Sequence, residues 1–198
     1  MHIMHEEKLG VFDSGVGGFS VLRELLKKTS VDTVYFGDCA RAPYGNRTNE
    51  VIVSYIEEII NDLKLKGVTH FVSACNSMSV VTTNALLKKC GVRGDHYIDM
   101  TRAYNAHSVF SGNEVVLVLG TNATIKSGTY QSILQSKGIL CYEHSYSSLA
   151  GAIEEGDNHE TLVGLIKPAF LFAKLMNVTH ILYGCTHYPL VHSVFLRA

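Results

Sequence analysis

Two cysteines of this 198-residue sequence lie in matching surroundings. The segments Val68–Ser77 and Val178–His187 each contain Val-Thr-His, a short apolar run, a small residue and then a cysteine, Cys75 in the first and Cys185 in the second. Each cysteine stands where a helix is expected to begin, and the positive end of a helix favours the reactive thiolate. Two such thiols across a cleft can invert a carbon centre, because one removes a proton from one face while the other protonates the opposite face.

Other polar side chains have types that suit such a site. Asp13 follows the apolar run Leu9–Phe12 and can orient an ammonium group, assist a thiol or simply cap a helix. His187 lies two residues after Cys185, which is close enough to assist proton transfer. A hydrolase with a cysteine nucleophile can also use this histidine, but it leaves Cys75 unexplained.

Two loops add candidate binding groups. The loop Asp13–Gly18 is rich in glycine and is either a plain tight turn or a loop that presents backbone N–H groups to an anion. Its spacing fits neither a dinucleotide fingerprint nor a Walker loop. Tyr44, in the turn Pro43–Gly45, can hydrogen-bond a ligand. No metal site is expected, because the sequence has neither a C-x-x-C nor an H-E-x-x-H motif. The cysteines outside the repeated context are interpreted as structural: Cys39, Cys90 and Cys141.

These residues must be positioned by a fold in which strands alternate with helices, which predicts parallel βαβ units and an α/β class. The expected strands are Leu9–Phe12, Thr33–Phe36, Phe71–Ala74, His96–Ile98, Val115–Leu119 and Ile181–Tyr183. The expected helices are Phe19–Lys28, Asn49–Lys66, Met78–Lys89, Arg102–Phe110, Lys126–Gln135 and Leu162–Leu175. Ligands of such folds bind at the carboxyl ends of strands, where Asp13 and both repeated cysteines are expected.

The repeated segment also predicts two similar halves. We expect a first α/β domain over residues 1–94 and a second over residues 95–198, with the chain passing between them near Gly91–Gly94. Each half then brings one thiol to its strand end.

The charge, hydropathy and cysteine content of the sequence argue against several classes of function. Lys and Arg number 17 and Asp and Glu 18, so the formal net charge of −1 gives no sign of a nucleic-acid or membrane partner. No apolar run has the length of a membrane helix, and the first eight residues do not resemble a signal peptide. Five widely spaced cysteines argue against a secreted disulfide framework and favour the cytoplasm. The expected partner is a small molecule, and a homodimer stays open.

At five motifs the sequence resembles the cofactor-independent glutamate racemases of the aspartate/glutamate racemase superfamily. In the family's order, and over nearly the whole chain, these are GVFDSGVGG (10–18), RAPYG (41–45), ACNS (74–77), LGTNAT (119–124) and YGCTHYPL (183–190). The last motif favours the glutamate branch over the aspartate racemases. The resemblance implies two pseudosymmetric parallel-sheet α/β domains with the active site in the cleft between them. It also implies interconversion of L- and D-glutamate without a cofactor, which supplies D-glutamate for peptidoglycan synthesis and so for the cell wall and cell shape.

The resemblance further assigns roles to single residues. It implies that Cys75 and Cys185 are the two acid/base residues, assisted by Asp13, His187 and Glu154. It implies substrate-binding positions at Asp13, Ser14, Tyr44, Gly45, Asn76, Ser77, Thr186 and His187.

Three features depart from the family pattern. Ser77 stands where the family usually has Thr and keeps the hydroxyl, whereas Tyr97–Thr101 differs from the usual entry into the second domain. The chain ends at Ala198, where family members continue for several dozen residues that complete the first domain. We therefore expect the C-terminal part of the first domain to be missing and apolar surface to be exposed there. Two alternatives remain: a racemase of aspartate or a related acid, and a catalytically silent homologue that binds a carboxylate.

Overall fold

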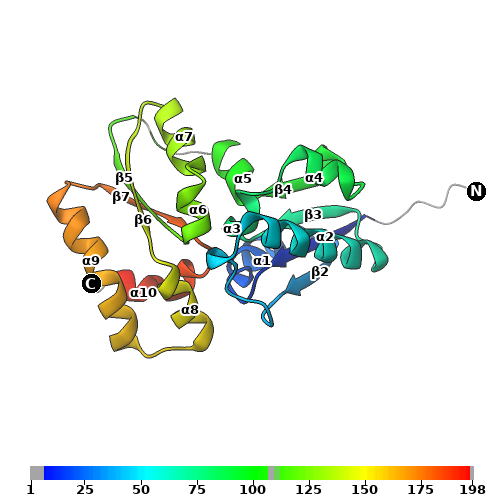
Figure 1. Cartoon of the computed structure of the whole chain (residues 1–198), viewed down its shortest axis with the longest axis horizontal. Helices are drawn as coiled ribbons and strands as arrows, with labels where there is room; N and C mark the ends of the chain where they lie inside the picture. Colours follow the sequence, from blue (N-terminus) through cyan, green and yellow to red (C-terminus); the bar gives the residue numbers. More distant parts are fainter. Residues whose placement is uncertain (1–6, 107–109, 111, 197–198) are drawn as a thin grey trace, which may run out of the picture.

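A computed structural model describes residues 7–106, 110 and 112–196. The chain forms two α/β units that lie side by side, each built on its own parallel sheet (Figure 1). The alternation of strands and helices expected from the sequence is confirmed. Within the described part of the chain, no helix is both long and apolar enough to span a membrane.

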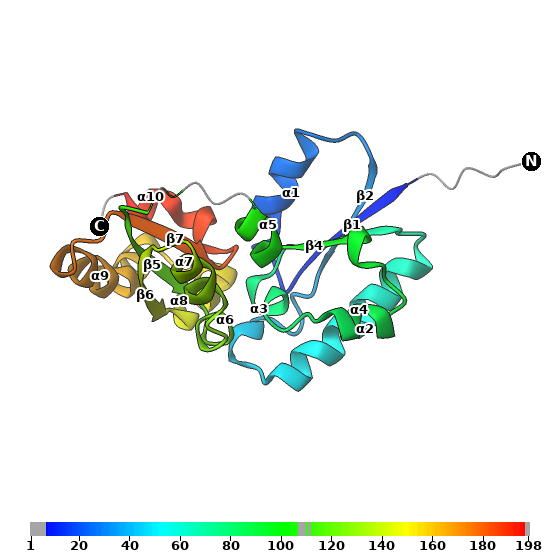
Figure 2. The same ribbon diagram turned by 90° about the horizontal axis from the view of Figure 1, so that it is seen from above.

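The first unit contains a four-stranded sheet in the order β2-β1-β3-β4. Its strands are β1 (Lys8–Asp13), β2 (Asp32–Gly37), β3 (His70–Ser73) and β4 (Tyr97–Asp99), and every neighbouring pair is parallel. Helix α1 covers one side of this sheet, and helices α2 and α4 cover the other (Figure 2). The helical segments are α1 (Phe19–Leu26), η1 (Tyr44–Asn46), α2 (Asn49–Leu65), α3 (Asn76–Ser79), α4 (Asn84–Lys89), η2 (Gly94–His96) and α5 (Met100–Ala106).

The second unit repeats this arrangement with three parallel strands in the order β6-β5-β7. The strands are β5 (Val115–Gly120), β6 (Leu140–Ser145) and β7 (His180–Gly184). Its helical segments are α6 (Asn122–Lys126), α7 (Thr129–Ser136), α8 (Ser147–Glu155), α9 (His159–Leu175), η3 (Tyr188–Val191) and α10 (His192–Phe195). Strand β5 is flanked by β6 and β7 as β1 is flanked by β2 and β3, so the two units are pseudosymmetric, as predicted.

Helix α2 shows how the apolar pattern builds the core of the first unit. Ile52, Ile56 and Ile60 lie on the helix face that packs against the sheet, and all three are fully buried. Burying one such side chain stabilises the fold by roughly 2 kcal/mol. The hydroxyl of Thr48 accepts a hydrogen bond from the Val51 N–H group, which fixes the start of this helix.

Three expected helices differ from the structure. The expected helix Met78–Lys89 is broken between α3 and α4, where β-branched residues lead to Thr83, whose hydroxyl caps α4. The expected helix Lys126–Gln135 is broken at Gly128, whose φ of 62° is left-handed. Helix α5 begins two residues before the expected Arg102–Phe110, and residues 107–109 of that range lie outside the described residues.

The chain passes between the sheets after β4. The expected division at residues 94 and 95 lies just before β4, which still pairs with β3 of the first sheet. Helix α1 of the first unit has no fully buried residue, and Phe19 and Leu26 are each about half exposed. Apolar side chains are also exposed in the second unit, at Leu171 and Leu175 of α9, so this exposure is not confined to the first unit. All five cysteines are free thiols.

Candidate active site

The carboxyl ends of β1, β3, β5 and β7 converge where the two units meet. The residues there enclose a cavity of only about 10 Å³, which is room for about one water molecule. Both repeated cysteines line it, one from each unit. The lining residues are Ser14, Pro43, Tyr44, Gly45, Cys75, Asn76, Ser77, Thr121, Ala150, Cys185, Thr186 and His187. We call this space the inner cavity.

Cys75 follows β3 and occupies the N-cap position of α3, where its side chain is buried. Its Sγ donates a hydrogen bond of 3.5 Å to Oγ of Ser14. Burial raises the pKa of the Cys75 thiol to about 11, and the negative charge of Asp13 adds to this rise. The hydrogen bond to Ser14 acts in the opposite direction.

Cys185 follows β7 and is equally buried. Its Sγ lies 3.7 Å from Nδ1 of His187. Burial raises the pKa of this thiol well above its ordinary value, and the negative charges of Cys75 and Asp13 raise it further. The sequence suggested that helix ends would favour both thiolates, but α3 is only four residues long and η3 is a 3-10 turn. Burial therefore outweighs the helix dipole, and both thiols keep their protons in the free protein.

Asp13 ends β1 as a fully buried carboxylate. Its Oδ1 accepts a hydrogen bond of 2.8 Å from the Gly15 N–H group, and its Oδ2 accepts one of 3.0 Å from the Thr186 hydroxyl. Burial raises the pKa of Asp13, while the charge of His187 and these hydrogen bonds lower it. Asp13 thus lies behind the cavity wall and joins the two units.

His187 and Glu154 form a second connection between the units. Nε2 of His187 lies 2.5 Å from Oε2 of Glu154, which projects from α8. The same carboxylate accepts hydrogen bonds of 3.3 and 3.2 Å from the Val16 N–H group of the first unit. A Cβ atom on Gly17 would lie 2.5 Å from Nδ1 of His187, so this loop needs glycine to let the imidazole approach.

Tyr44 lines the inner cavity from the turn before α2, and its surroundings include an acid that sequence reasoning missed. The Tyr44 hydroxyl donates a short hydrogen bond to Asp38, which follows β2 and is buried. Nε of Arg41 donates to the same carboxylate at 2.6 Å. Asp38 directly follows β2, much as Asp13 ends β1, and this position at the end of a strand was the signal that could have identified it.

Asn76 and Ser77 bring polar groups from α3. Oδ1 of Asn76 accepts a hydrogen bond of 2.5 Å from the Tyr130 hydroxyl, while its buried Nδ2 has no hydrogen-bond partner among the described residues. Oγ of Ser77 lies 2.9 Å from Oγ1 of Thr121, which follows β5. Tyr130 and Thr121 were not predicted as site residues. Thr121 lies in the motif LGTNAT (119–124), whereas no motif or repeat in the sequence around Tyr130 indicates a site residue.

The site thus collects two buried thiols, a buried carboxylate, an acid–imidazole pair and an unpaired amide donor. Among the described residues, no three His, Cys, Asp or Glu side chains are grouped so that they could hold a metal ion. Two thiols that line one cavity, with hydroxyls beside them and the Asp13 carboxylate behind the wall, can bind a small zwitterion and exchange a proton with it.

The chain is similar to known proteins in sequence and in fold. No protein-family model matches the chain. The glutamate racemase of Aquifex aeolicus is 36% identical over 190 residues, which cover 93% of this chain and 72% of that protein. The crystal structure of glutamate racemase from Francisella tularensis in complex with D-glutamate matches with a TM-score of 0.85 at 27% identity, over 98% of this chain and 74% of that one.

A second solved structure gives the same result. Glutamate racemase isoform RacE1 from Bacillus anthracis matches with a TM-score of 0.84 at 28% identity, over 96% of this chain and 72% of that one. Each of these matches covers more than nine-tenths of this chain and therefore extends over both units. The chain therefore belongs to the glutamate racemase family of isomerases.

Proposed function

We propose that this chain interconverts L- and D-glutamate by direct proton transfer between the substrate and two cysteines, Cys75 and Cys185. The observation that carries the proposal is that one buried thiol from each unit lines the same inner cavity. The structure of the Francisella tularensis relative with D-glutamate supports glutamate as the small-molecule substrate.

The residues around the cavity suit an amino acid with two carboxylates. The buried carboxylate of Asp13, held by Gly15 and Thr186, attracts the α-ammonium group. The free Nδ2 of Asn76 donates to a substrate carboxylate, because a buried amide donor without a partner costs roughly 1–3 kcal/mol that a ligand can recover. Further polar contacts come from the side chains and backbone of residues in both units: Ser14, Tyr44, Gly45, Ser77, Thr186 and His187.

Proton transfer needs one thiolate and one thiol at the same time. In the free protein burial keeps both cysteines protonated, since the pKa of Cys75 is raised to about 11 and that of Cys185 is also raised. A bound α-ammonium group adds a positive charge beside them, which lowers the cost of a thiolate. The thiolate then removes the α-proton from one face, and the opposite thiol gives its proton to the other face. The roles of the two cysteines are exchanged for the reverse reaction.

His187 and Glu154 assist on the side of Cys185. The imidazole lies 3.7 Å from the Cys185 thiol and is held from behind by the Glu154 carboxylate at 2.5 Å. An imidazole oriented in this way can accept the thiol proton and return it. The negative charge that develops on the substrate is stabilised by the donors around its carboxylate, in a cavity that excludes most water.

The proposed physiological role is the supply of D-glutamate for peptidoglycan synthesis in the cytoplasm. This part of the proposal rests on membership of the family and on the absence of a disulfide among the five cysteines. A homodimer stays a prediction.

Circular dichroism of the free amino acid tests the function directly. The purified chain should convert either enantiomer of glutamate to the racemic mixture and should leave L-aspartate unchanged. Turnover of aspartate alone would favour a racemase of the shorter acid. Calorimetric binding of glutamate without any change in optical activity would favour a carboxylate-binding protein instead.

A further inference from the structure

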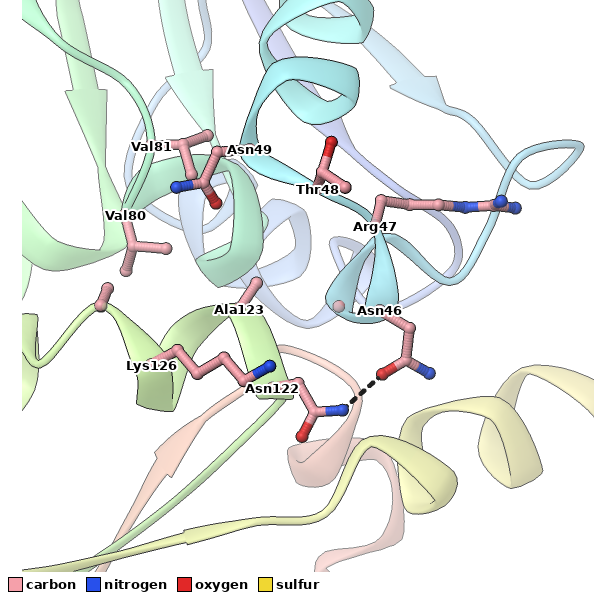
Figure 3. A pocket seen from close by; sticks show the side chains of 11 residues that line it. Asn46, Arg47, Thr48, Asn49, Val80, Val81, Asn122, Ala123 and Lys126 are labelled. Atoms are coloured by element: carbon pink, nitrogen blue, oxygen red, sulfur yellow. Dashed lines mark hydrogen bonds between the residues drawn. The ribbon is translucent and has the colours of Figure 1, made fainter.

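A much larger hollow lies beside the inner cavity, on the side of α2 and α6. Its volume is about 720 Å³, and it shares Gly45 with the inner cavity. We call it the cleft basin. Its lining residues, shown as sticks in Figure 3, are Gly45, Asn46, Arg47, Thr48, Asn49, Val80, Val81, Asn122, Ala123, Lys126 and Ser127.

The cleft basin carries positive charge that no acid neutralises. Its lining includes Arg47 and Lys126 but neither Asp nor Glu. Lys126 is exposed and takes part in no ion pair with the residues that the structure describes. In Figure 3 the Lys126 ammonium points toward Asn122, while the Arg47 side chain extends away from the other labelled residues. The 17-residue helix α2 begins in the same wall at Asn49 and adds the positive end of its dipole.

A second hollow of about 450 Å³ touches the inner cavity from the side of α1, through Asn76, Cys185 and Thr186. Its wall is formed largely by apolar side chains, among them Val21 and Leu25. Arg23, Lys28 and the acid Glu24 also line it, and Glu24 accepts hydrogen bonds from Arg23 and Lys27. The lining of this hollow therefore carries one net positive charge, whereas that of the cleft basin carries two, so a carboxylate is attracted more strongly to the cleft basin.

The inner cavity itself has no room for an amino acid as large as glutamate, so one of its walls must open. On the side of the cleft basin, the two units are joined by a hydrogen bond of 2.7 Å from Nδ2 of Asn122 to Oδ1 of Asn46. Gly45 and Thr121 are in close contact beneath it, since a Cβ atom on Gly45 would collide with the Thr121 side chain. Opening this wall would also separate Oγ of Ser77 from Oγ1 of Thr121 and Ala123 of α6 from the core of the first unit.

We propose that the cleft basin is the entrance to the inner cavity, where Lys126 captures a carboxylate of the incoming acid before the Asn46–Asn122 contact opens. The inference rests on the proposed function for the identity of the acid. The chemistry that recognises it is general to small carboxylates, since it consists of an unpaired ammonium, side-chain amides and a helix end.

Alkylation of the buried thiols tests the entrance without requiring racemisation. Iodoacetate is a small carboxylate and iodoacetamide is its neutral counterpart, and the labelling of each cysteine is followed by peptide mass spectrometry. In Lys126→Glu the rate for iodoacetate at Cys75 and Cys185 should fall about fivefold or more at low salt, while the rate for iodoacetamide stays the same. The difference should shrink at about 0.5 M salt because the charge is screened.

The matched control is Lys167→Glu, a change of the same charge at an exposed position on α9. The exposed Cys39 serves as an internal reference in every sample. Equal iodoacetate rates at the buried thiols in Lys126→Glu and Lys167→Glu would overturn the proposal and favour the hollow beside α1.

Kinetics then link the entrance to the substrate. Lys126→Gln should lower kcat/KM for glutamate about fivefold at low salt, chiefly through KM, and Lys167→Gln should not. A wild-type protein that shows the predicted labelling but no racemisation would contradict the proposed function and leave the entrance standing.

Discussion

The carboxylate of Asp13 accepts a hydrogen bond of 3.0 Å from the hydroxyl of Thr186, although the two residues are 173 positions apart. This bond joins the last residue of β1 to the residue after Cys185. Ser14, the neighbour of Asp13, accepts the hydrogen bond from Cys75. The contact between Asp13 and Thr186 therefore fixes the position of one thiol relative to the other.

Thr186→Val removes this contact at nearly constant volume. The fully buried Asp13 carboxylate then loses one of its donors, which should lower the free energy of unfolding by about 1–3 kcal/mol. Denaturant melts measure the change. Thr33→Val is the control, because its hydroxyl donates to a backbone carbonyl in an exposed turn, and it should cost under about 0.5 kcal/mol. Equal costs would show that the buried contact contributes little.

Glu154→Gln keeps an acceptor for the Val16 N–H group but removes the charge behind His187. We expect kcat/KM to fall roughly 10- to 100-fold, because the imidazole loses its orienting partner. The two enantiomers of glutamate have equal free energies, so kcat/KM must fall equally in both directions. A difference between the two directions can appear only in kcat and KM taken separately, and the two must then differ between the directions by the same factor. Glu155→Gln, the exposed neighbour, should retain full activity, and a similar loss there would argue against the assisting role.

Gly17→Ala tests the close approach of the glycine loop to His187. The added Cβ atom would lie 2.5 Å from Nδ1, so the imidazole must move away from Cys185. Racemisation should fall at least about tenfold. Gly151→Ala in α8 adds the same atom where it meets nothing within 4 Å, and it should be neutral or stabilising by up to about 1 kcal/mol. Full activity of Gly17→Ala would exclude a role for this contact.

The pKa of Cys75 predicts the pH dependence of the free enzyme. Because burial raises this pKa to about 11, the thiolate fraction increases about tenfold for each pH unit below that value. Stopped assays between pH 7 and 9 should therefore show kcat/KM rising with pH, with no plateau in that interval. A plateau below pH 8 would mean that the base is another group.

The raised pKa of Cys75 also makes the free energy of unfolding depend on pH. The folded protein holds the Cys75 proton up to about pH 11, whereas the unfolded chain releases it near the ordinary value of about 8.5. The free energy of unfolding should therefore decrease as the pH rises from about 9 to 11. Cys75→Ser should decrease less over this interval, because its hydroxyl does not titrate there.

The sequence predicted those features of the fold that depend on local pattern. The repeat around Cys75 and Cys185 predicted two similar units, and the strands β3 and β7 hold equivalent places in the two sheets. It could not predict the strand Leu140–Ser145, because Cys141–His144 mixes polar and apolar residues and the strand lies at a sheet edge.

The candidate site was predictable where a residue follows a strand. Asp13, Cys75 and Cys185 all do so, and the structure brings all three together. Tyr130 was not predictable, because its hydrogen bond to Asn76 joins residues 54 positions apart and depends on how the two units pack. The raised pKa values of the thiols were also missed, since burial depends on the closed cleft and not on the neighbouring sequence.

Proton NMR of L- and D-glutamate in D₂O measures the central claim most directly. Wild type should replace the α-proton of either enantiomer with deuterium and form the mirror image. Cys75→Ser and Cys185→Ser should each lose racemisation by about 10²-fold or more while keeping the fold. Any residual exchange should be confined to opposite enantiomers in the two variants, because each keeps the thiol on one face. Racemisation at the wild-type rate in either variant would contradict the account.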